Sequence, residues 1–68
     1  MPHKNYTRVR LLTDRYKEEG VGFGDTGYII EIYDNEYEVE FSNDKGITIA
    51  QVVVKYDEVE SAEFGQAN

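Results

Sequence analysis

The chain has 68 residues, of which 40% are hydrophobic and 13% aromatic, and it contains no Cys. This length allows one domain near the lower size limit for folding without staples, and the lack of Cys excludes disulfides and thiolate metal sites. No apolar run approaches the about 20 residues that cross a bilayer, and residues 1–10 lack the apolar stretch of a signal peptide. We therefore expect a cytoplasmic protein with no membrane partner.

The net charge of −7 is unevenly distributed. Residues 1–17 carry five cations and one Asp, a balance of +4, whereas residues 18–68 carry two Lys and thirteen carboxylates, a balance of −11. Most of the chain should therefore repel polyanions and attract basic surfaces over about one Debye length.

Alternation from Tyr6 to Leu12 predicts a first strand, with Val9 and Leu11 on one face and Arg8 and Arg10 on the other. Residues 13–25 show no consistent period and contain three closely spaced glycines. They predict a long loop over one end of the sheet, in which the two apolar side chains of its second half fold back as plugs. Those two residues are Val21 and Phe23.

A turn signal at residues 25–27 precedes a second alternating run. One face of this run is Tyr28, Ile30 and Ile32, which we predict to point inward, and the other is Ile29, Glu31 and Tyr33. Asp34-Asn35 predicts a tight connection, because both residue types tolerate positive φ.

The third run has the clearest alternation in the chain. Tyr37, Val39 and Phe41 are predicted to point inward, and Glu36, Glu38 and Glu40 outward. A hairpin turn of about five residues with a late Gly, 42–46, should follow.

The fourth predicted strand, residues 47–54, has an ambiguous pattern, because continuing the parity of its two Ile residues would bury Gln51. Either both faces are partly covered, or a bulge near Ala50 and Gln51 switches the inward set to Val52 and Val54. We favour the bulge, because a small barrel needs a sharp bend to close.

Residues 55–58 predict a short helical turn, and residues 59–62 a brief last strand that pairs with the first. The predicted fold is therefore all-β, a single five-stranded SH3-like, partly open barrel over residues 6–62 with a short helical turn before the last strand. Residues 1–5 and 63–68 are predicted to be a flexible leader and tail. The predicted core consists of Val9, Leu11, Tyr28, Ile30, Ile32, Tyr37, Val39, Phe41, Ile49, Val52, Val54 and Val59.

Enzymatic and metal chemistry find little support in the sequence. The sole His is His3 and there is no Cys, so no activated nucleophile is indicated. The G-x-G-x-G pattern at residues 20–24 lacks the strand-to-helix context of a nucleotide cradle. The spacing of Asp34, Glu36 and Asp44 does not match a calcium-binding loop. We expect no enzyme activity, no cofactor and no dedicated metal site.

The predicted acidic outer face is the stronger functional signal. Like charges on adjacent strands cost stability unless something compensates them, although a solvated face that only confers solubility is the simpler alternative. Aromatic residues among the carboxylates resemble the anchors of protein interfaces. The candidate partner-binding residues are Glu31, Tyr33, Glu36, Glu38, Glu40, Asp57, Glu58 and Glu60.

The basic N-terminal quarter provides the alternative, a nucleic-acid surface formed by Arg8, Arg10, Arg15 and Lys17. The balance of −11 in the rest of the chain opposes the long-range attraction on which such binding depends. Cross-strand pairing of these cations with nearby glutamates is the structural alternative.

Several short segments of the sequence together resemble one known family. They are Val9-Arg10-Leu11-Leu12, Gly24-Asp25-Thr26-Gly27, Tyr37-Glu38-Val39-Glu40-Phe41, Thr48-Ile49-Ala50 and Asp57-Glu58-Val59. The likeness, over roughly residues 6–61, is to a bacterial family called domain of unknown function 4926. It implies a small SH3-like barrel, and because members are often encoded near toxins, it implies an immunity role. The turn at residues 24–27 also resembles RNA-binding ribosomal barrels and the barrel subunit of photosystem I, but the acidic third strand departs from the RNA-binding pattern.

The leading hypothesis is a non-enzymatic module that binds a basic protein, in its sharpest form an immunity protein that neutralises a toxin such as a nuclease. The alternatives are an RNA-binding or ribosome-associated barrel and a structural subunit of a larger assembly.

Overall fold

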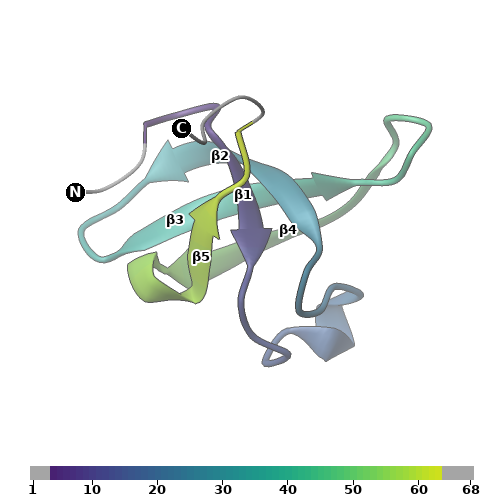
Figure 1. Ribbon diagram of the computed structural model, residues 1–68, viewed down its shortest axis with the longest axis horizontal. Coiled ribbons are helices and arrows are strands. Elements are labelled where there is room, and N and C mark those ends of the chain that lie inside the picture. The colour runs from purple at the N-terminus through teal and green to yellow at the C-terminus, as the bar shows by residue number, and fades with distance from the viewer. Residues whose placement is uncertain (1–3, 64–68) are drawn as a thin grey trace.

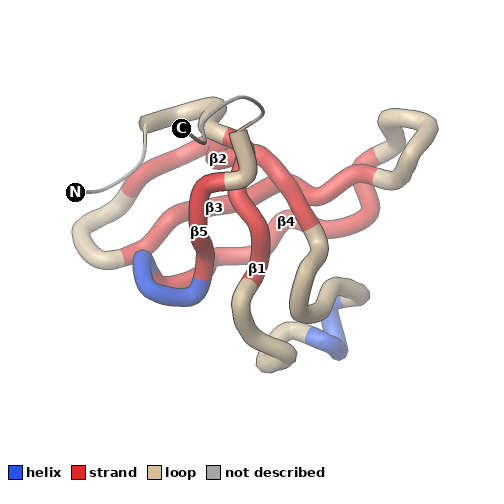
Figure 2. The backbone as a smooth tube through the Cα atoms, in the orientation of Figure 1, coloured by secondary structure: helices blue, strands red, loops and turns tan. Residues whose placement is uncertain are grey.

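The computed structural model describes residues 4–63, which form one sheet of five antiparallel strands in the order β4-β3-β2-β1-β5. The strands are β1 (Arg8–Leu11), β2 (Thr26–Ile32), β3 (Glu36–Ser42), β4 (Thr48–Lys55) and β5 (Val59–Ser61). Two 3-10 turns, η1 (Lys17–Glu19) and η2 (Tyr56–Glu58), lie in the connections before β2 and β5 (Figure 2). The all-β class, the five strands and the helical turn before the last strand are confirmed.

The sheet twists until β1 and β5 cross the direction of β3 and β4 (Figure 1). Within residues 4–63, β4 and β5 are not hydrogen-bonded to one another, so they are the two edges of the sheet and the architecture is open. The last strand pairs with the first as predicted, with Leu11 opposite Val59 and Arg10 opposite Glu60. The sequence prediction of a partly open arrangement is therefore confirmed.

The inner face of the twisted sheet forms the hydrophobic core. Its buried side chains are Val9, Leu11, Val21, Ile29, Tyr37, Val39, Phe41, Val52, Val54 and Val59. The predicted alternation of β3 is confirmed, because its three apolar residues are almost fully buried and its glutamates point to the other face. Burial of this many aliphatic and aromatic groups is the main stabilising term in so small a domain.

The predicted parity of β2 is wrong. Tyr28 is exposed and Ile29 is fully buried, opposite Val39. The register shifts between Ile29 and Glu31, so Ile30 is a β-bulge and is only half-buried. Beyond the bulge, Ile32 faces Tyr37 but stays partly exposed and does not belong to the core. A bulge inserts one unpaired residue and reverses the parity after it, which the alternation of β2 alone did not reveal.

The fourth strand has its register shift next to Phe41, where Ser42 pairs with Thr48 and Ile49 is left unpaired. The inward set Val52 and Val54 is confirmed. The predicted burial of Ile49 is wrong, because its side chain is exposed. The register shift lies at Ile49, one residue before the bulge that was predicted near Ala50 and Gln51.

Loop 12–25 covers one end of the sheet. Val21 is buried in the core as predicted, whereas the predicted inward position of Phe23 is wrong, because that side chain is exposed. Its backbone N–H donates to the Asp14 carboxylate at 2.8 Å, which holds the chain in this path. Gly24 N–H donates to Leu11 O at 2.8 Å, and Leu11 N–H to Asp25 O at 2.8 Å, so the loop is tied to β1 before β2 begins.

Close packing at the start of β2 requires a glycine. A Cβ on Gly27 would lie 2.6 Å from Glu40 O and 2.9 Å from the Phe41 ring. Neither contact is possible for a real Cβ without a backbone shift, because protein interiors are close-packed. Gly27 thus lets β2 approach β3 at the point where the Phe41 side chain is buried.

The two hairpin turns differ in how well they were predicted. The turn at Asp34-Asn35 forms, but neither residue has a positive φ, so that part of the prediction is wrong. The second turn has Gly46 at φ 80° and is closed by Asn43, whose side chain accepts hydrogen bonds from Lys45 and Ile47 N–H.

Residues 1–3 and 64–68, which include His3 and most of the predicted leader and tail, lie outside the described residues. Within residues 4–63, Glu63 accepts a hydrogen bond from Arg8 N–H at 3.0 Å. No helix in this part of the chain is long or apolar enough to cross a membrane.

Candidate functional site

The outer face of β2, β3 and β4 carries most of the predicted partner-binding residues. Because strand residues alternate between faces, the glutamates between the buried residues of β3 all project from this side. The register places Glu40 between Tyr28 of β2 and Gln51 of β4. Glu38 lies in the same way between Glu31 and Val53. The predicted set Glu31, Glu36, Glu38 and Glu40 is therefore brought together, and we call this surface, with Tyr28, Tyr33 and Val53, the acidic face.

Glu31 and Glu38 are directly opposite one another on neighbouring antiparallel strands. Like charges in this arrangement repel, since Cβ atoms of opposed residues are about 5 Å apart. The Tyr33 hydroxyl donates a hydrogen bond to Glu38 Oε1 at 2.8 Å and disperses part of that charge. This hydrogen bond also raises the pKa of Tyr33 above its usual value of 10.0.

No cation compensates these four carboxylates among residues 4–63. The ion pairs of this part of the chain join Arg10 to Glu60, Arg15 to Glu58 and Lys17 to Asp14. Lys55 is opposite Glu36 in the ladder but forms no ion pair within 4.0 Å. Glu40 accepts a hydrogen bond from the Thr48 hydroxyl at 2.9 Å, which is a neutral donor. The acidic face therefore retains its negative charge.

Exposed apolar surface lies among these charges. Tyr28 is 47% exposed, Tyr33 45% and Val53 43%. Aromatic side chains next to charged groups bury large area at low entropy cost when a partner covers them. The acidic face thus combines charge with apolar anchors.

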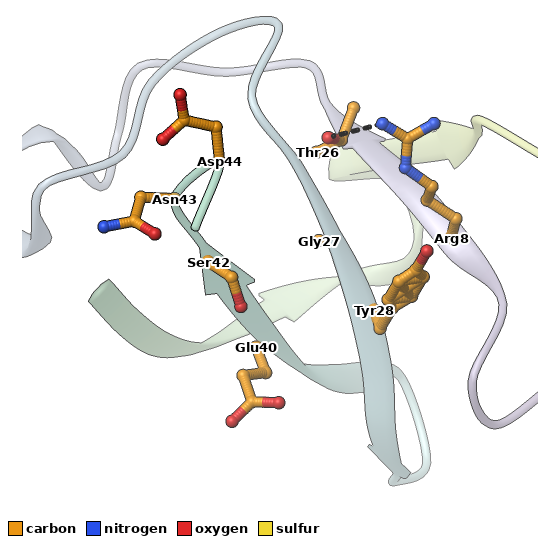
Figure 3. A pocket seen from close by; sticks show the side chains of 8 residues that line it. All are labelled: Arg8, Thr26, Gly27, Tyr28, Glu40, Ser42, Asn43 and Asp44. Atoms are coloured by element: carbon orange, nitrogen blue, oxygen red, sulfur yellow. Dashed lines mark hydrogen bonds between the residues drawn. The ribbon is translucent and has the colours of Figure 1, made fainter. Parts of the chain in front are cut away.

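A hollow of about 350 Å³ opens at one end of the acidic face. Figure 3 shows Arg8 and Tyr28 on one side of Gly27, and Glu40 and Asp44 on the other. The Arg8 guanidinium is held by Thr26 Oγ1 at 3.2 Å and Ala62 O at 3.4 Å. One cation and two carboxylates line the hollow, so its rim has a formal charge of −1 and suits a cationic side chain.

Three further predicted residues have different surroundings. Asp57 is exposed on η2, and Glu60 pairs with Arg10 across β1 and β5 at 2.9 Å. Glu58 is only 8% exposed and is not part of the surface. Its inclusion among the exposed candidates is therefore corrected: its carboxylate points toward loop 12–25, where it is bound.

Glu58 joins loop 12–25 to the end of β4. Its carboxylate accepts hydrogen bonds from the Tyr16 hydroxyl at 2.6 Å, Arg15 Nη1 at 3.0 Å and Lys55 N–H at 2.9 Å. Burial alone would raise the pKa of Glu58, but these hydrogen bonds and the Arg15 charge lower it below the usual 4.5. Burial, together with the hydrogen bond to Glu58, raises the pKa of Tyr16 to about 12.

The four predicted nucleic-acid-binding cations do not form one patch of unpaired charge. Arg8 and Arg10 lie on the outer side of β1, where the guanidinium groups contact Thr26 and Glu60. Arg15 is bound to Glu58, and Lys17 lies 3.8 Å from Asp14. The cross-strand pairing weighed from the sequence is thus observed for Arg10.

Sequence reasoning missed three contributors to this surface and its hollow: Tyr28, Val53 and Asp44. The Ile30 bulge explains the omission of Tyr28, because the unbroken alternation assigned that residue to the core. No group of three Asp, Glu or His side chains that could hold a metal ion is found in residues 4–63, so Asp34, Glu36 and Asp44 do not converge.

Residues 6–61 match the model of a family described as a domain of unknown function, DUF4926. The chain belongs to this family. No curated protein and no solved structure matches the chain. The match covers all five strands, so the membership predicted from the turn and core segments is confirmed.

Proposed function

We propose that this member of DUF4926 is a non-enzymatic protein-binding module, and that its acidic face docks a basic surface of another protein. The proposal is supported above all by one observation: Glu31 and Glu38 oppose each other on adjacent strands and form no ion pair with any cation of residues 4–63. Such a pair lowers the stability of the free domain and is relieved when a partner supplies positive charge.

The apolar groups of the same face supply the rest of the interface. Tyr28, Tyr33 and Val53 are exposed between or beside the carboxylates. A basic partner is first steered by the charge and then held by contacts with these side chains. The hollow between Tyr28, Glu40 and Asp44 would accept an Arg or Lys, with its stem against the ring and its charge near the carboxylates.

In its sharpest form the module is a cytoplasmic immunity protein that covers the substrate-binding surface of a basic toxin such as a nuclease. An enzyme that binds polyanions has a basic surface, and the acidic face is complementary to it. Nucleic-acid binding has less support, because Arg10, Arg15 and Lys17 are paired with carboxylates of the same chain.

The proposal is tested by capturing partners on the immobilised chain from extracts of its native host and measuring the affinity of a captured protein by calorimetry. Two double variants with the same charge change are compared, Glu38→Lys/Glu40→Lys on the acidic face and Glu18→Lys/Glu19→Lys on exposed η1. The acidic-face variant should bind at least about tenfold more weakly for each desolvated ion pair that the substitutions remove. The η1 variant should keep the affinity of the unaltered chain.

Equal weakening in both variants would mean that only the net charge attracts the captured protein, and equal retention would exclude the acidic face. The immunity form has its own test. The captured protein is expressed alone and together with this chain, and the chain should restore growth only while its acidic face is intact.

A further inference from the structure

The two edges of the sheet differ in how they are protected against pairing with another strand. The β5 edge is three residues long and carries the charged Glu60 in its middle. The β4 edge is eight residues long, TIAQVVVK, with no acidic residue, no Pro and a single Lys at its end. Natural proteins usually shorten, charge or bend such an edge, because its unpaired backbone groups template the addition of another strand.

The register identifies the free backbone groups of β4. Tyr56 N–H donates to Asn35 O at 3.2 Å, in register with the β3–β4 ladder. Hydrogen-bonded and non-hydrogen-bonded pairs alternate in an antiparallel ladder. Val54 and Val52 therefore bond to β3, whereas the N–H and C=O groups of Gln51 and Val53 point away from it.

Two observations agree with this assignment. Lys55 has the same parity as Gln51 and Val53, and its N–H donates to the Glu58 carboxylate rather than to β3. No strand of residues 4–63 lies beyond β4 in the sheet. The Ile49 bulge interrupts the edge on one side and the Glu58 hydrogen bond ends it on the other, so the free edge is a short segment centred on Gln51 and Val53.

We propose that this free edge accepts an extended segment of the basic partner as a sixth strand. Backbone pairing to an exposed edge is an established mode of peptide recognition, in which main-chain hydrogen bonds give affinity and alternate side chains give specificity. The segment alternates basic and apolar residues, since its outward side chains lie next to Val53 and Gln51, directly beyond Glu38 and Glu40.

Strand spacing allows these charges to meet. An added strand lies about 10 Å from β3, two strand separations away. Val53 and Gln51 are short or neutral, so the stem of an Arg or Lys lies across them and its charge reaches Glu38 or Glu40. The inference that the segment is positively charged rests on the proposed function. The inference that it pairs with β4 rests on the free edge alone.

The test uses a synthetic peptide of about seven residues that alternates Arg and Val, added to the full chain and observed through its amide resonances and hydrogen exchange. The Gln51 and Val53 amides should shift and become protected, and those of Val52 and Val54 should keep the protection that they have from β3. N-methylation of alternate peptide amides should weaken binding about tenfold when it blocks the pairing edge, and little when it blocks the other edge.

A protein variant tests the same point. Val53→Pro removes an N–H group at the free edge without removing a hydrogen bond to β3. Edge strands tolerate Pro at positions of this kind, where the N–H faces solvent. Val53→Thr is the matched control that keeps the N–H. The Pro variant should bind the peptide about tenfold more weakly than the Thr variant. Should Val53→Pro fail to fold, the N-methylated peptides decide the question on the unaltered protein.

Other results have definite meanings. The peptide could shift the amide resonances of Glu31 and Glu38 while N-methylation of either peptide edge has no effect on its affinity. This result would overturn edge pairing and remain consistent with binding to the acidic face. An alternating Glu-Val peptide could bind as strongly as the Arg-Val peptide and be equally sensitive to N-methylation. This result would support edge pairing and overturn the proposed basic character of the partner. The chain could also fail to bind the peptide but dimerise in sedimentation experiments, with the dimer abolished by Val53→Pro. This result would overturn the proposal and indicate that a second copy of the chain pairs with the β4 edge.

Discussion

Arg10 on β1 and Glu38 on β3 both project from the outer side of the same sheet, but their neighbours differ. Arg10 has the opposite charge of Glu60 across the strand pair, at 2.9 Å. Glu38 has the like charge of Glu31 across its pair. The same contrast extends to the surrounding residues, since Arg15 and Lys17 are paired with acids of loop and turn, and Glu36 and Glu40 form no ion pair in residues 4–63.

This difference separates two roles for charge in one small domain. The cations near the N-terminus hold segments together: Arg15, through Glu58, ties loop 12–25 to η2. The carboxylates of β3 accept hydrogen bonds only from neutral hydroxyl groups among residues 4–63, and the repulsion between Glu38 and Glu31 weakens the free domain slightly. Carboxylates that form no ion pair within residues 4–63 and do not hold segments together are the ones that a partner can use.

The largest effect should come from the paired region. Glu58→Ala removes the acceptor of three hydrogen bonds, one of them from a guanidinium, and leaves Tyr16 without its partner. We expect a loss of about 3 kcal/mol in the free energy of unfolding, measured by urea denaturation. Glu38→Ala, which removes a half-buried carboxylate from the acidic face, should change the free energy of unfolding by less than about 0.5 kcal/mol. Equal losses in the two variants would remove the distinction between the regions.

The pH dependence of stability should have the same origin. The folded pKa of Glu58 lies below its usual value of 4.5, so its contribution is present above pH 4.5 and is lost as the pH falls through the folded pKa. The Tyr16 pKa is raised from 10.0 to about 12, so its contribution is present below pH 10 and is lost as the pH rises toward 12.

Urea denaturation from pH 2 to 7 checks the acidic limb of this dependence (an approximate range that brackets carboxyl titration). The decrease below pH 4.5 should be shallower in Glu58→Gln, which cannot ionise. Glu60→Gln is the control, because Glu60 is exposed and, among residues 4–63, its carboxylate contacts the Arg10 guanidinium alone instead of three donors. An identical acidic limb in the wild type and Glu58→Gln would show that other carboxyls dominate.

Where the sequence pattern was strong, it predicted the architecture. Three buried apolar residues alternating with three glutamates specified β3, its inward face and the outward carboxylates. The second strand was not determined in this way, because Tyr28 and Ile29 are both compatible with a buried position. Their assignment depends on the Ile30 bulge, which arises from pairing with β3 and from the bend of the sheet rather than from local composition.

The candidate site was predictable only as far as strand parity extends. Glu31, Glu36, Glu38 and Glu40 follow from alternation and adjacency, and the structure brings them together. The buried position of Glu58 could not be predicted in this way, because a short polar turn gives no signal that one of its carboxylates points inward. The available hint was a Glu three residues after Lys55, a spacing at which a side chain often caps the start of a helical turn.

The exposed pair of the basic region should contribute little. Arg10 and Glu60 are both about half exposed, so their coupling in a double-mutant cycle of Arg10→Gln and Glu60→Gln should be about 0.2–1 kcal/mol. The coupling should decrease in high salt, because the pair is accessible to screening ions. A coupling energy of zero at low salt would show that the 2.9 Å contact does not stabilise the strand pair.

The smallest effect has the opposite sign and tests the acidic face most directly. Glu38→Gln removes the repulsion with Glu31 and keeps an oxygen for the Tyr33 hydroxyl, so the domain should become more stable by about 0.2–0.5 kcal/mol. Glu36→Gln is the control, because the residue opposite Glu36 is Lys55 and not a carboxylate, so its neutralisation relieves no cross-strand repulsion and should not stabilise the domain. Urea denaturation at low and high salt should show the gain shrinking as ions screen the repulsion. If Glu38→Gln is instead the less stable of the two, the carboxylate is a structural part of the sheet, and its availability to a partner loses its physical basis.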